Sequence, residues 1–269
     1  MFKHIIIALL LFTISCTQTF ETQESAQTNS KDGVFVLCYH SFTNFPHEIT
    51  FPIKQLILHI ETLQNGGFNF ITTEDLYAGR YKGLNNVLIT SDDGNKSIYK
   101  AYFEVFKKYN IKPLIAIFPA IIGKRDYALT WEQIAELRKE GCHIAAHGYF
   151  HVFLDAKAYR ADPHSCKREV TESKKLLESK LKFNINTFVY PYGKRCNEVV
   201  KLVEETGYSF GFTVENGIVY RDDPNLNLLE MPRYMIINSN VNQIFELMFE
   251  ATGKTYTPNP ALRAFSGKK

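Results

Sequence analysis

The amino-acid sequence predicts an α/β fold, a deformed (β/α)7-type barrel in a single domain. Three observations support this prediction. Short apolar, strand-like runs recur along the chain, helical periods lie between them, and polar residues directly follow several of the apolar runs. Strands that alternate with helices indicate βα units around a parallel sheet. About seven such units fit a closed or nearly closed barrel better than an open sheet.

The predicted elements follow one another from residue 34 onward. The strand-like runs cover residues 34–39, 69–71, 87–90, 114–118, 143–146, 187–190, 210–213 and 228–232. The helical stretches cover residues 52–65, 73–79, 96–109, 130–140, 164–181, 195–206 and 241–251. Thr73 is followed by Glu74 and Asp75, as at a helix start. Thr130 begins another helix, which Gly141 ends.

The N-terminal sequence "MFKHIIIALLLFTISC" is typical of an export signal. It has a basic start, an apolar run at residues 5–12 and small residues before Cys16, and the apolar run is too short to span a membrane. It resembles a bacterial lipoprotein signal, in which the cysteine is lipidated, although Thr13 stands where leucine is usual. We therefore expect an exported protein of the cell envelope, held to a membrane by a lipid on Cys16, with ordinary secretion as the alternative.

The chain divides into four expected parts: a signal peptide (1–15), a polar, flexible tether (16–33), one domain (34–255) and a C-terminal tail (256–269). We expect a monomer. The formal net charge of +3 and the even spread of lysine and glutamate argue against a nucleic-acid partner. Cys38 and Cys142 lie in apolar runs and are expected to be buried thiols, whereas a disulfide between Cys166 and Cys196 is left open.

Polar residues cluster where the predicted strands end. His40 follows the first strand, Asp92 and Asp93 follow the run at 87–90, and His147 follows the run at 143–146. Tyr192 lies in the turn after the run at 187–190. In parallel barrels the strands present their carboxyl ends on one face, where chemistry takes place. We therefore expect these side chains to lie close together.

The histidines His147 and His151 are four residues apart, which places both imidazoles on one side of a helical turn. With one carboxylate they make a two-histidine, one-acid set, a common arrangement at catalytic metals. Either motif alone is weak evidence, since histidine pairs are often structural and paired aspartates often cap helices. A glycosidase pair does not fit, because Asp92 and Asp93 are adjacent and leave the strand in different directions. Adjacent aspartates suit divided roles, one on a metal and one beside it.

Three motifs, "ITSDDG", "HGYFH" and "YPYG", occur in the order typical of one enzyme family. With "VLCYHSF" and "GGFNFITTEDL" they resemble the polysaccharide deacetylases that carry the NodB homology domain (carbohydrate esterase family 4) over residues 34–235. The "CYHSF" segment is similar to the branch that deacetylates poly-N-acetylglucosamine in biofilms. The resemblance implies a single catalytic domain, with a metal-dependent hydrolase activity that removes N-acetyl groups from an N-acetylhexosamine polysaccharide.

The resemblance also implies roles for individual residues. Asp93, His147 and His151 would hold a divalent metal, expected to be Zn²⁺, with Ni²⁺, Co²⁺ or Fe²⁺ as alternatives. Asp92 would be the general base that takes the proton of a metal-activated water. Tyr192 would offer its backbone N–H to the oxyanion, and an ordinary turn residue is the alternative reading.

The sequence departs from the family pattern at three places. Ser91 stands where phenylalanine is usual, Gly148 replaces a serine or threonine that would support the metal ligands, and the arginine before the Pro-Tyr-Gly turn is replaced by Val189-Tyr190. We expect Gly148 to loosen its turn.

A late leucine-histidine motif, the usual source of the general acid, is also missing. His40 ends a strand at the same rim as Asp93, and in the biofilm branch an early histidine at the matching "YH" position takes the acid role. The resemblance therefore implies that His40 is the general acid. The alternative is that His40 only hydrogen-bonds a loop carbonyl. Arg233 is a weaker candidate, for orienting one of the acidic groups. Two other functions stay open: a catalytically weak carbohydrate-binding protein on this fold, and an O-acetyl esterase.

Overall fold

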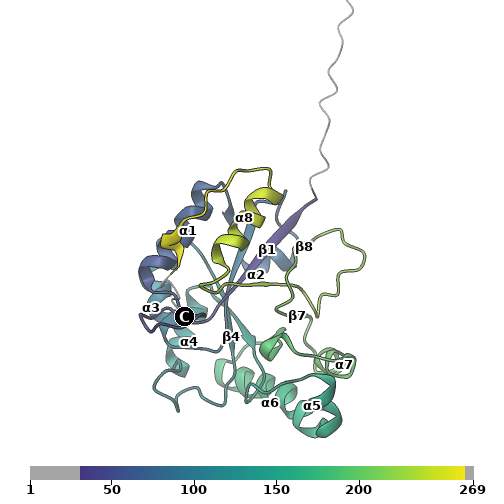
Figure 1. Cartoon of the computed structure of the whole chain (residues 1–269). Coiled ribbons are helices and arrows are strands. Elements are labelled where there is room, and N and C mark those ends of the chain that lie inside the picture. The colour runs from purple at the N-terminus through teal and green to yellow at the C-terminus, as the bar shows by residue number, and fades with distance from the viewer. Residues whose placement is uncertain (1–30, 264–269) are drawn as a thin grey trace, which may run out of the picture.

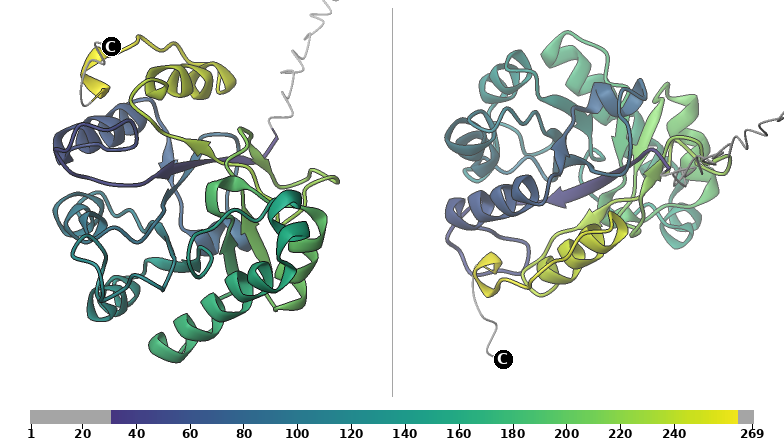
Figure 2. Two further views of the ribbon diagram at one scale, coloured as in Figure 1. Left: turned by 60° about the horizontal axis from the view of Figure 1, so that its bottom comes forward. Right: turned by 90° about the horizontal axis from the view of Figure 1, so that it is seen from above.

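The computed structural model describes residues 31–263. The predicted signal peptide, Cys16, most of the predicted tether and the end of the predicted tail lie outside the described residues. The described part is one α/β domain in which helices surround a curled sheet (Figures 1 and 2). The predicted deformed barrel is confirmed. Within residues 31–263, no helix combines the length and apolar character needed to cross a membrane.

Nine strands make up the sheet. Their bounds are β1 Gly33–Tyr39, β2 Asn69–Phe70, β3 Asn86–Ser91, β4 Leu114–Ile117, β5 His143–Ala146, β6 Thr187–Val189, β7 Phe210–Phe212, β8 Val219–Tyr220 and β9 Tyr234–Met235. The order is β7-β6-β5-β4-β3-β1-β8, with β2 also beside β3 and β9 beside β1. Only the β1–β8 pair is antiparallel among the described strands. In the described part β7 and β8 do not pair, so the sheet curls without closing.

Strand β1 lies at the centre of this arrangement. It pairs with β3 along most of its length, while its other edge pairs first with β8 and then with β9. All of its residues are buried, because both faces of the sheet are covered. Phe35 and Leu37 face the large cluster under the helices, whereas Val34 and Val36 face a smaller cluster inside the curl. The interior of the curl is therefore packed, and chemistry is confined to its rim.

Eight α-helices pack around the sheet in the described part. Their bounds are α1 Ile53–Asn65, α2 Thr73–Tyr77, α3 Ser97–Ala101, α4 Trp131–Lys139, α5 Ala156–Ala161, α6 Pro163–Leu181, α7 Asn197–Glu205 and α8 Val241–Ala251. Figure 1 shows α5, α6 and α7 gathered at the lower right, away from α1 and α8 at the top. Helices α1 and α8 lie side by side, with the rings of His59 and Phe245 5.6 Å apart between centroids.

Most predicted elements are confirmed, with shifts of a few residues at their ends. The helix predicted at 96–109 is shorter, because α3 passes into a π-helical turn at Tyr102–Phe106. The strand predicted at 228–232 is wrong: this segment makes only an isolated bridge, Phe212 to Met231. It approaches β7 so closely that a Cβ on Gly211 would lie 2.1 Å from the Leu229 carbonyl oxygen, and Pro232 has no N–H with which to extend the pairing. The short elements α5, β8 and β9 are not predicted by the sequence patterns.

The four cysteines in the described part are free thiols. Cys38 and Cys142 are buried, as predicted. Cys166 is also buried, on α6, and Cys196 is half-buried at the N-terminal end of α7. The disulfide that the sequence left open between Cys166 and Cys196 is not formed in this structure.

The segment assigned to a C-terminal tail packs against the domain as far as Leu262. Tyr256 donates a hydrogen bond to Asn242 of α8 (2.6 Å), and a short 3₁₀ turn at Pro260–Leu262 contacts α1. Leu262 is fully buried, and its carbonyl oxygen lies 2.7 Å from Nε2 of His59. His59 Nδ1 lies 3.1 Å from the Tyr39 hydroxyl. A neutral imidazole satisfies both contacts, since Nε2–H donates to the carbonyl and Nδ1 accepts from the hydroxyl.

His59 should make the domain less stable in mild acid. Burial lowers the pKa of His59 from 6.5 to about 4. Between these pH values the unfolded chain binds a proton that the folded chain excludes, so stability falls as the pH drops, by about 3 kcal/mol in total. Urea unfolding at pH 7.5 and 4.5 measures the loss. His59→Gln keeps a donor and an acceptor but does not titrate, and its loss should be smaller by that amount; an equal loss in both proteins would contradict the assignment.

Candidate metal centre and catalytic residues

The polar residues at the strand ends meet at one rim of the sheet, as the sequence predicts. His40 follows β1, Asp92 and Asp93 follow β3, and His147 follows β5. Strands β1 and β3 pair in register up to Tyr39 and Ser91, and Asp92 N–H donates to the Tyr39 carbonyl (2.9 Å). The parallel pairing therefore brings residues that lie far apart in the sequence to the same level.

Asp93, His147 and His151 form one compact group. Asp93 Oδ1 lies 3.3 Å from His151 Nε2 and 3.6 Å from His147 Nε2, and the two Nε2 atoms are 3.1 Å apart. One donor atom from each residue lies within 4.8 Å of the other two. The structure thus brings together the three predicted ligands.

The protonation of this group favours a bound cation. His147 Nδ1 lies 2.7 Å from the Val189 carbonyl oxygen, which can only accept, so Nδ1 carries the proton and Nε2 keeps its lone pair toward Asp93. Burial lowers the pKa of His147 to about 3 and also lowers the pKa of His151, so both are neutral near neutral pH. Asp93 Oδ1 is buried and has no hydrogen-bond partner in the described part of the chain.

These residues fit a divalent metal. An unpartnered carboxylate oxygen and an imidazole lone pair face each other, which is unfavourable unless a cation lies between them. One carboxylate and two imidazoles are the ligand types that Zn²⁺ and neighbouring transition metals accept, with positions left for water and substrate.

Asp92 has a different environment from its neighbour. Its Oδ1 and Oδ2 each accept a hydrogen bond from Arg233, both at 2.8 Å, and Asp92 and Arg233 are almost completely buried. Arg233 also donates to the Thr213 carbonyl and to the Thr90 hydroxyl. Burial by itself would raise the pKa of Asp92, but the charge of the Arg233 guanidinium outweighs it and holds that pKa well below its usual value. Arg233, expected to orient one of the acidic groups, thus contacts Asp92.

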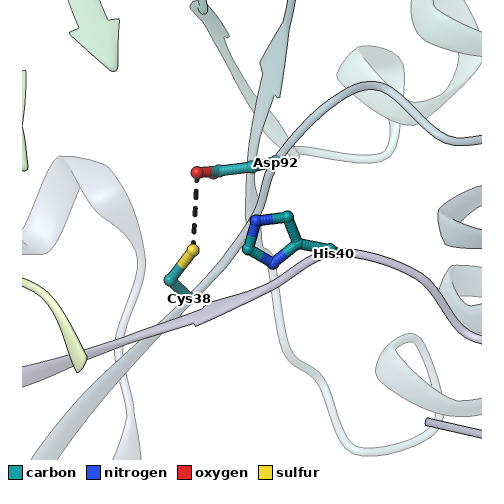
Figure 3. A group of neighbouring side chains, drawn as sticks. All are labelled: Cys38, His40 and Asp92. Atoms are coloured by element: carbon teal, nitrogen blue, oxygen red, sulfur yellow. Dashed lines mark hydrogen bonds between the residues drawn. The ribbon is translucent and has the colours of Figure 1, made fainter. Parts of the chain in front are cut away.

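A second group, Cys38, His40 and Asp92, also has three donor atoms within 4.8 Å of one another. Figure 3 shows the Cys38 thiol and the His40 ring extending from β1 and its end toward Asp92, with Cys38 Sγ 3.4 Å from Asp92 Oδ2. This group does not fit a cation. Both Asp92 oxygens already bind the positive guanidinium of Arg233, and burial raises the pKa of Cys38 well above its usual value, so the thiol keeps its proton.

His40 is half-buried, and its Nδ1 is buried without a hydrogen-bond partner in the described part of the chain. Among the described residues, His40 Nδ1 therefore does not make the hydrogen bond to a loop carbonyl that the alternative interpretation of His40 expects. One ring nitrogen of His40 lies within 4.8 Å of an Asp92 carboxylate oxygen, at the same rim as the proposed metal ligands.

Backbone strain collects at the same rim. Five non-glycine residues of the described chain have positive φ, and three of them are Asp93 (72°), His151 (64°) and Tyr192 (57°). Such conformations are costly for residues with a Cβ and persist where the surroundings enforce them, often at active sites. The strained residues are two of the predicted metal ligands and the predicted oxyanion residue.

Tyr192 lies in the Pro191–Gly193 turn after β6, next to His151. The ring centroids of Tyr192 and His151 are 4.5 Å apart, and Phe153 stacks on Tyr192 at 4.4 Å. Phe118 lies on His151 at 5.0 Å. Tyr192 and Phe153 are each 50% exposed, so they present an apolar surface beside the metal site. Phe118, the last residue of the strand predicted at 114–118, and Phe153 are not predicted from the sequence as site residues.

The departures from the family pattern have structural explanations. The expectation that Gly148 loosens its turn is wrong, because the buried carboxylate of Glu169 accepts hydrogen bonds from the backbone N–H groups of the following residues. Val189 is buried inside the curl and contributes its carbonyl oxygen to His147, while Arg233 brings a guanidinium to Asp92 instead. Ser91 is buried, 3.5 Å from the His40 carbonyl oxygen. Glu169 is not predicted from the sequence; the signal that points to it is a charged residue in the buried stripe of α6.

Comparisons with known proteins identify the family of this chain. A family model described as "Polysaccharide deacetylase" matches residues 80–211. A Bacillus subtilis (strain 168) protein named "Putative polysaccharide deacetylase YxkH" is 30% identical over 206 residues, which cover 75% of this chain and 72% of the relative. The chain belongs to the polysaccharide deacetylase family. This deacetylase is therefore a hydrolase that acts on an acetylated polysaccharide.

Two further relatives extend the comparison. A Staphylococcus aureus (strain MSSA476) protein named "Poly-beta-1,6-N-acetyl-D-glucosamine N-deacetylase" is 23% identical over 195 residues. The matched residues cover 68% of the present chain and 66% of the relative. The solved "Structure of IcaB from Ammonifex degensii" matches with a TM-score of 0.71 and 24% identity. The match covers 81% of the present chain and 97% of the IcaB chain. The structural match confirms the fold.

Proposed function

We propose that this deacetylase is a metal-dependent N-deacetylase of an N-acetylhexosamine polysaccharide, with poly-N-acetylglucosamine as the preferred substrate. The observation that carries the proposal is the pair of adjacent aspartates in opposite environments. Asp93 faces two neutral histidines, and Asp92 is held as an anion by Arg233 beside them. The name of the Staphylococcus aureus relative and the "YH" segment at the end of β1 support poly-N-acetylglucosamine over chitin-like glycans and peptidoglycan.

Asp93, His147 and His151 would hold the metal. When bound, a metal such as Zn²⁺ polarises the acetamide carbonyl and lowers the pKa of a coordinated water toward 7. Asp92 accepts a proton from the attacking water, because its carboxylate is anionic and fixed in place by the fork of Arg233. The water oxygen bonds to the carbonyl carbon, and the backbone N–H of Tyr192 donates to the oxyanion that forms.

His40 completes the reaction. As the carbon–nitrogen bond breaks, His40 gives a proton to the leaving nitrogen, so the products are acetate and a free amine on the sugar. Two observations support this role: His40 lies beside Asp92, and its buried Nδ1 has no partner among the described residues. The exposed faces of Tyr192 and Phe153 give the apolar side of a sugar ring a surface next to the site.

A surface groove with a volume of about 1000 Å³ is lined in part by residues that come two positions after the catalytic residues in the sequence. Its lining includes Phe42 and Asn95, which follow His40 and Asp93, together with Tyr99 and Tyr127. The lining of the groove does not include the proposed metal ligands Asp93, His147 and His151. We assign it to neighbouring sugar units of the polymer, since a long glycan chain must continue past the site where one acetyl group is removed.

The decisive experiment compares the purified domain before and after removal of metal by a chelator. It is assayed on poly-N-acetylglucosamine, chitin oligomers, peptidoglycan and an O-acetylated glycan, and both acetate and free amine are measured. We expect acetate and amine in equal amounts from poly-N-acetylglucosamine, no activity after chelation and recovery with Zn²⁺. Acetate without amine would identify an O-acetyl esterase. Glycan binding with no bound metal and no product would identify a carbohydrate-binding protein and overturn the proposal.

We also propose that the protein is exported and anchored through a lipid on Cys16, which lies outside the described residues. The signal-like N-terminal sequence supports this proposal. Replacing the cysteine (Cys16→Ser) should move the protein from the membrane fraction to the soluble fraction, because the replacement has no thiol to acylate. Equal distribution of both proteins would leave ordinary secretion as the explanation.

A further inference from the structure

Helix α6 carries an acidic residue where an apolar one is expected. Glu169 lies in the buried stripe of this helix with Cys166, Val170 and Leu177, and none of its surface is exposed. No lysine or arginine pairs with it among the described ion pairs. A carboxylate in such a place requires strong hydrogen bonding, since burying an unpaired charge is costly.

The hydrogen bonds come from the loop that joins the two predicted histidine ligands. Glu169 Oε2 accepts from the N–H groups of Tyr149 (2.9 Å), Phe150 (2.9 Å) and His151 (3.2 Å), and Oε1 accepts from Phe150 (3.1 Å). Three consecutive backbone donors therefore converge on one carboxylate. Bonds of this kind, from N–H groups to an anion, are stronger than those between neutral groups.

Gly148 makes this contact possible. A Cβ at this position would lie 2.8 Å from Glu169 Oε2 and 3.1 Å from Cγ of Pro191, and its φ of +71° suits glycine. A larger residue would therefore push the carboxylate away from the loop. The glycine that departs from the family pattern and the buried glutamate form one unit.

We infer that Glu169 is a positioning residue for the metal centre: it fixes the His147–His151 loop and so sets how tightly the metal is held. The inference rests on the metal dependence proposed above. His151 has a strained backbone (φ 64°), and its N–H is one of the three that Glu169 binds. Among the described contacts of the loop, no other acceptor replaces Glu169 for these three N–H groups. Without the carboxylate, His151 can therefore move away from the position in which its Nε2 lies 3.3 Å from Asp93 Oδ1.

The test measures the metal affinity of Glu169→Gln by competition between the protein and a chelator for Zn²⁺. The amide has nearly the same size but offers one accepting oxygen and no charge. The control is Glu172→Gln on the same helix, whose side chain is 43% exposed and pairs only with Lys175 at 3.7 Å. We expect Zn²⁺ to bind about 10–100-fold more weakly to Glu169→Gln, as is typical when a residue that supports a metal ligand is lost. Glu172→Gln should match the wild type, and kcat of Glu169→Gln at saturating Zn²⁺ should stay within a few-fold of the wild type.

These readouts separate positioning from stability. A residue that only stabilises the fold would lower the melting temperature and leave the Zn²⁺ affinity of the folded protein unchanged. An affinity within twofold of the wild type in folded Glu169→Gln overturns the inference while leaving the proposed function intact. A wild-type protein that binds no divalent metal overturns both.

A measurement on the wild type applies even if Glu169→Gln does not fold, and a double variant gives a further test where Glu169→Ala folds. Hydrogen exchange in the wild type should show slow amides at residues 149–151, and exchange as fast as in an exposed loop would overturn the inference. Gly148→Ala should weaken Zn²⁺ binding while Glu169 is present. In a Glu169→Ala background the same substitution should weaken Zn²⁺ binding much less, because the contact between the new Cβ and Glu169 Oε2 no longer exists. Equal costs in both backgrounds would show that the two residues act independently and would also overturn it.

Discussion

Asp92→Asn is expected to lower the turnover of the metal-loaded enzyme by at least about 100-fold. The amide cannot take a proton from the attacking water, whereas the metal ligands Asp93, His147 and His151 are unchanged. Metal content and turnover are measured on the same folded sample. His151→Ala is the contrasting variant: it should lose the metal and all activity, because it removes one of the three donors. Full activity in metal-loaded Asp92→Asn would exclude Asp92 as the base.

Asp92→Asn should also lower the stability of the fold, because of a contact that the sequence does not reveal. Both oxygens of Asp92 accept from Arg233, and an asparagine accepts at only one of them and leaves the buried guanidinium without a counter-charge. Breaking a buried pair in this way costs about 3–5 kcal/mol. Asp92→Asn should therefore also be less stable, and adding Arg233→Met should recover part of the loss without recovering activity. Recovery of activity in the double variant would contradict the role of Asp92.

His40→Ala is expected to lower turnover by about 10²–10⁴-fold while the metal stays bound. The leaving nitrogen needs a proton when the carbon–nitrogen bond breaks, and His40 is the histidine at the rim that is not among the proposed ligands. The measurement compares kcat and metal content of His40→Ala with the wild type on the same polymer. His164→Ala is the matched control, since this histidine lies exposed on α6 and is neither a proposed metal ligand nor the proposed acid.

A leaving group that is easier to expel provides a second check on His40. An aryl ester of acetate releases a stable phenolate and needs no proton from an acid, so His40→Ala should lose much less activity on this substrate than on the amide. An equal loss on both substrates would point to damage of the site in general. Unchanged turnover on the amide would remove His40 from the mechanism.

The sequence predicts those parts of the site that depend on strand ends. Asp93 follows β3 and His147 follows β5, two parallel strands with β4 between them. The carboxyl ends of parallel strands lie at one rim, so the meeting of these residues follows from the pattern. His151 follows from its spacing to His147. The contact between Arg233 and Asp92 is harder to predict, because Arg233 comes just before the two-residue strand β9, which has no periodicity to reveal it.

Two predictions from the sequence are wrong at places where the backbone makes close tertiary contacts. The apolar run at 228–232 has the composition of a strand, yet it joins β7 only through an isolated bridge and the backbone hydrogen bonds around it, and it lies very close to Gly211. Gly148 suggests a loosened turn when the local sequence is considered alone, and only the tertiary contact with Glu169 shows the opposite. Both features depend on partners that no local pattern identifies, whereas helices and buried strands are specified by their own residues.

The position of β1 has a consequence for how the protein reaches its active form. β1 is made first, but it pairs with β9, where Leu37 meets Tyr234, and Arg233 comes immediately before that pairing. Contacts between residues so far apart in the sequence form slowly, because most of the chain must be closed into a loop first. A nascent chain can thus carry Asp93, His147 and His151 well before it carries the arginine that holds Asp92. Activity is acquired last, and until then one edge of the first strand is open to pairing with other chains.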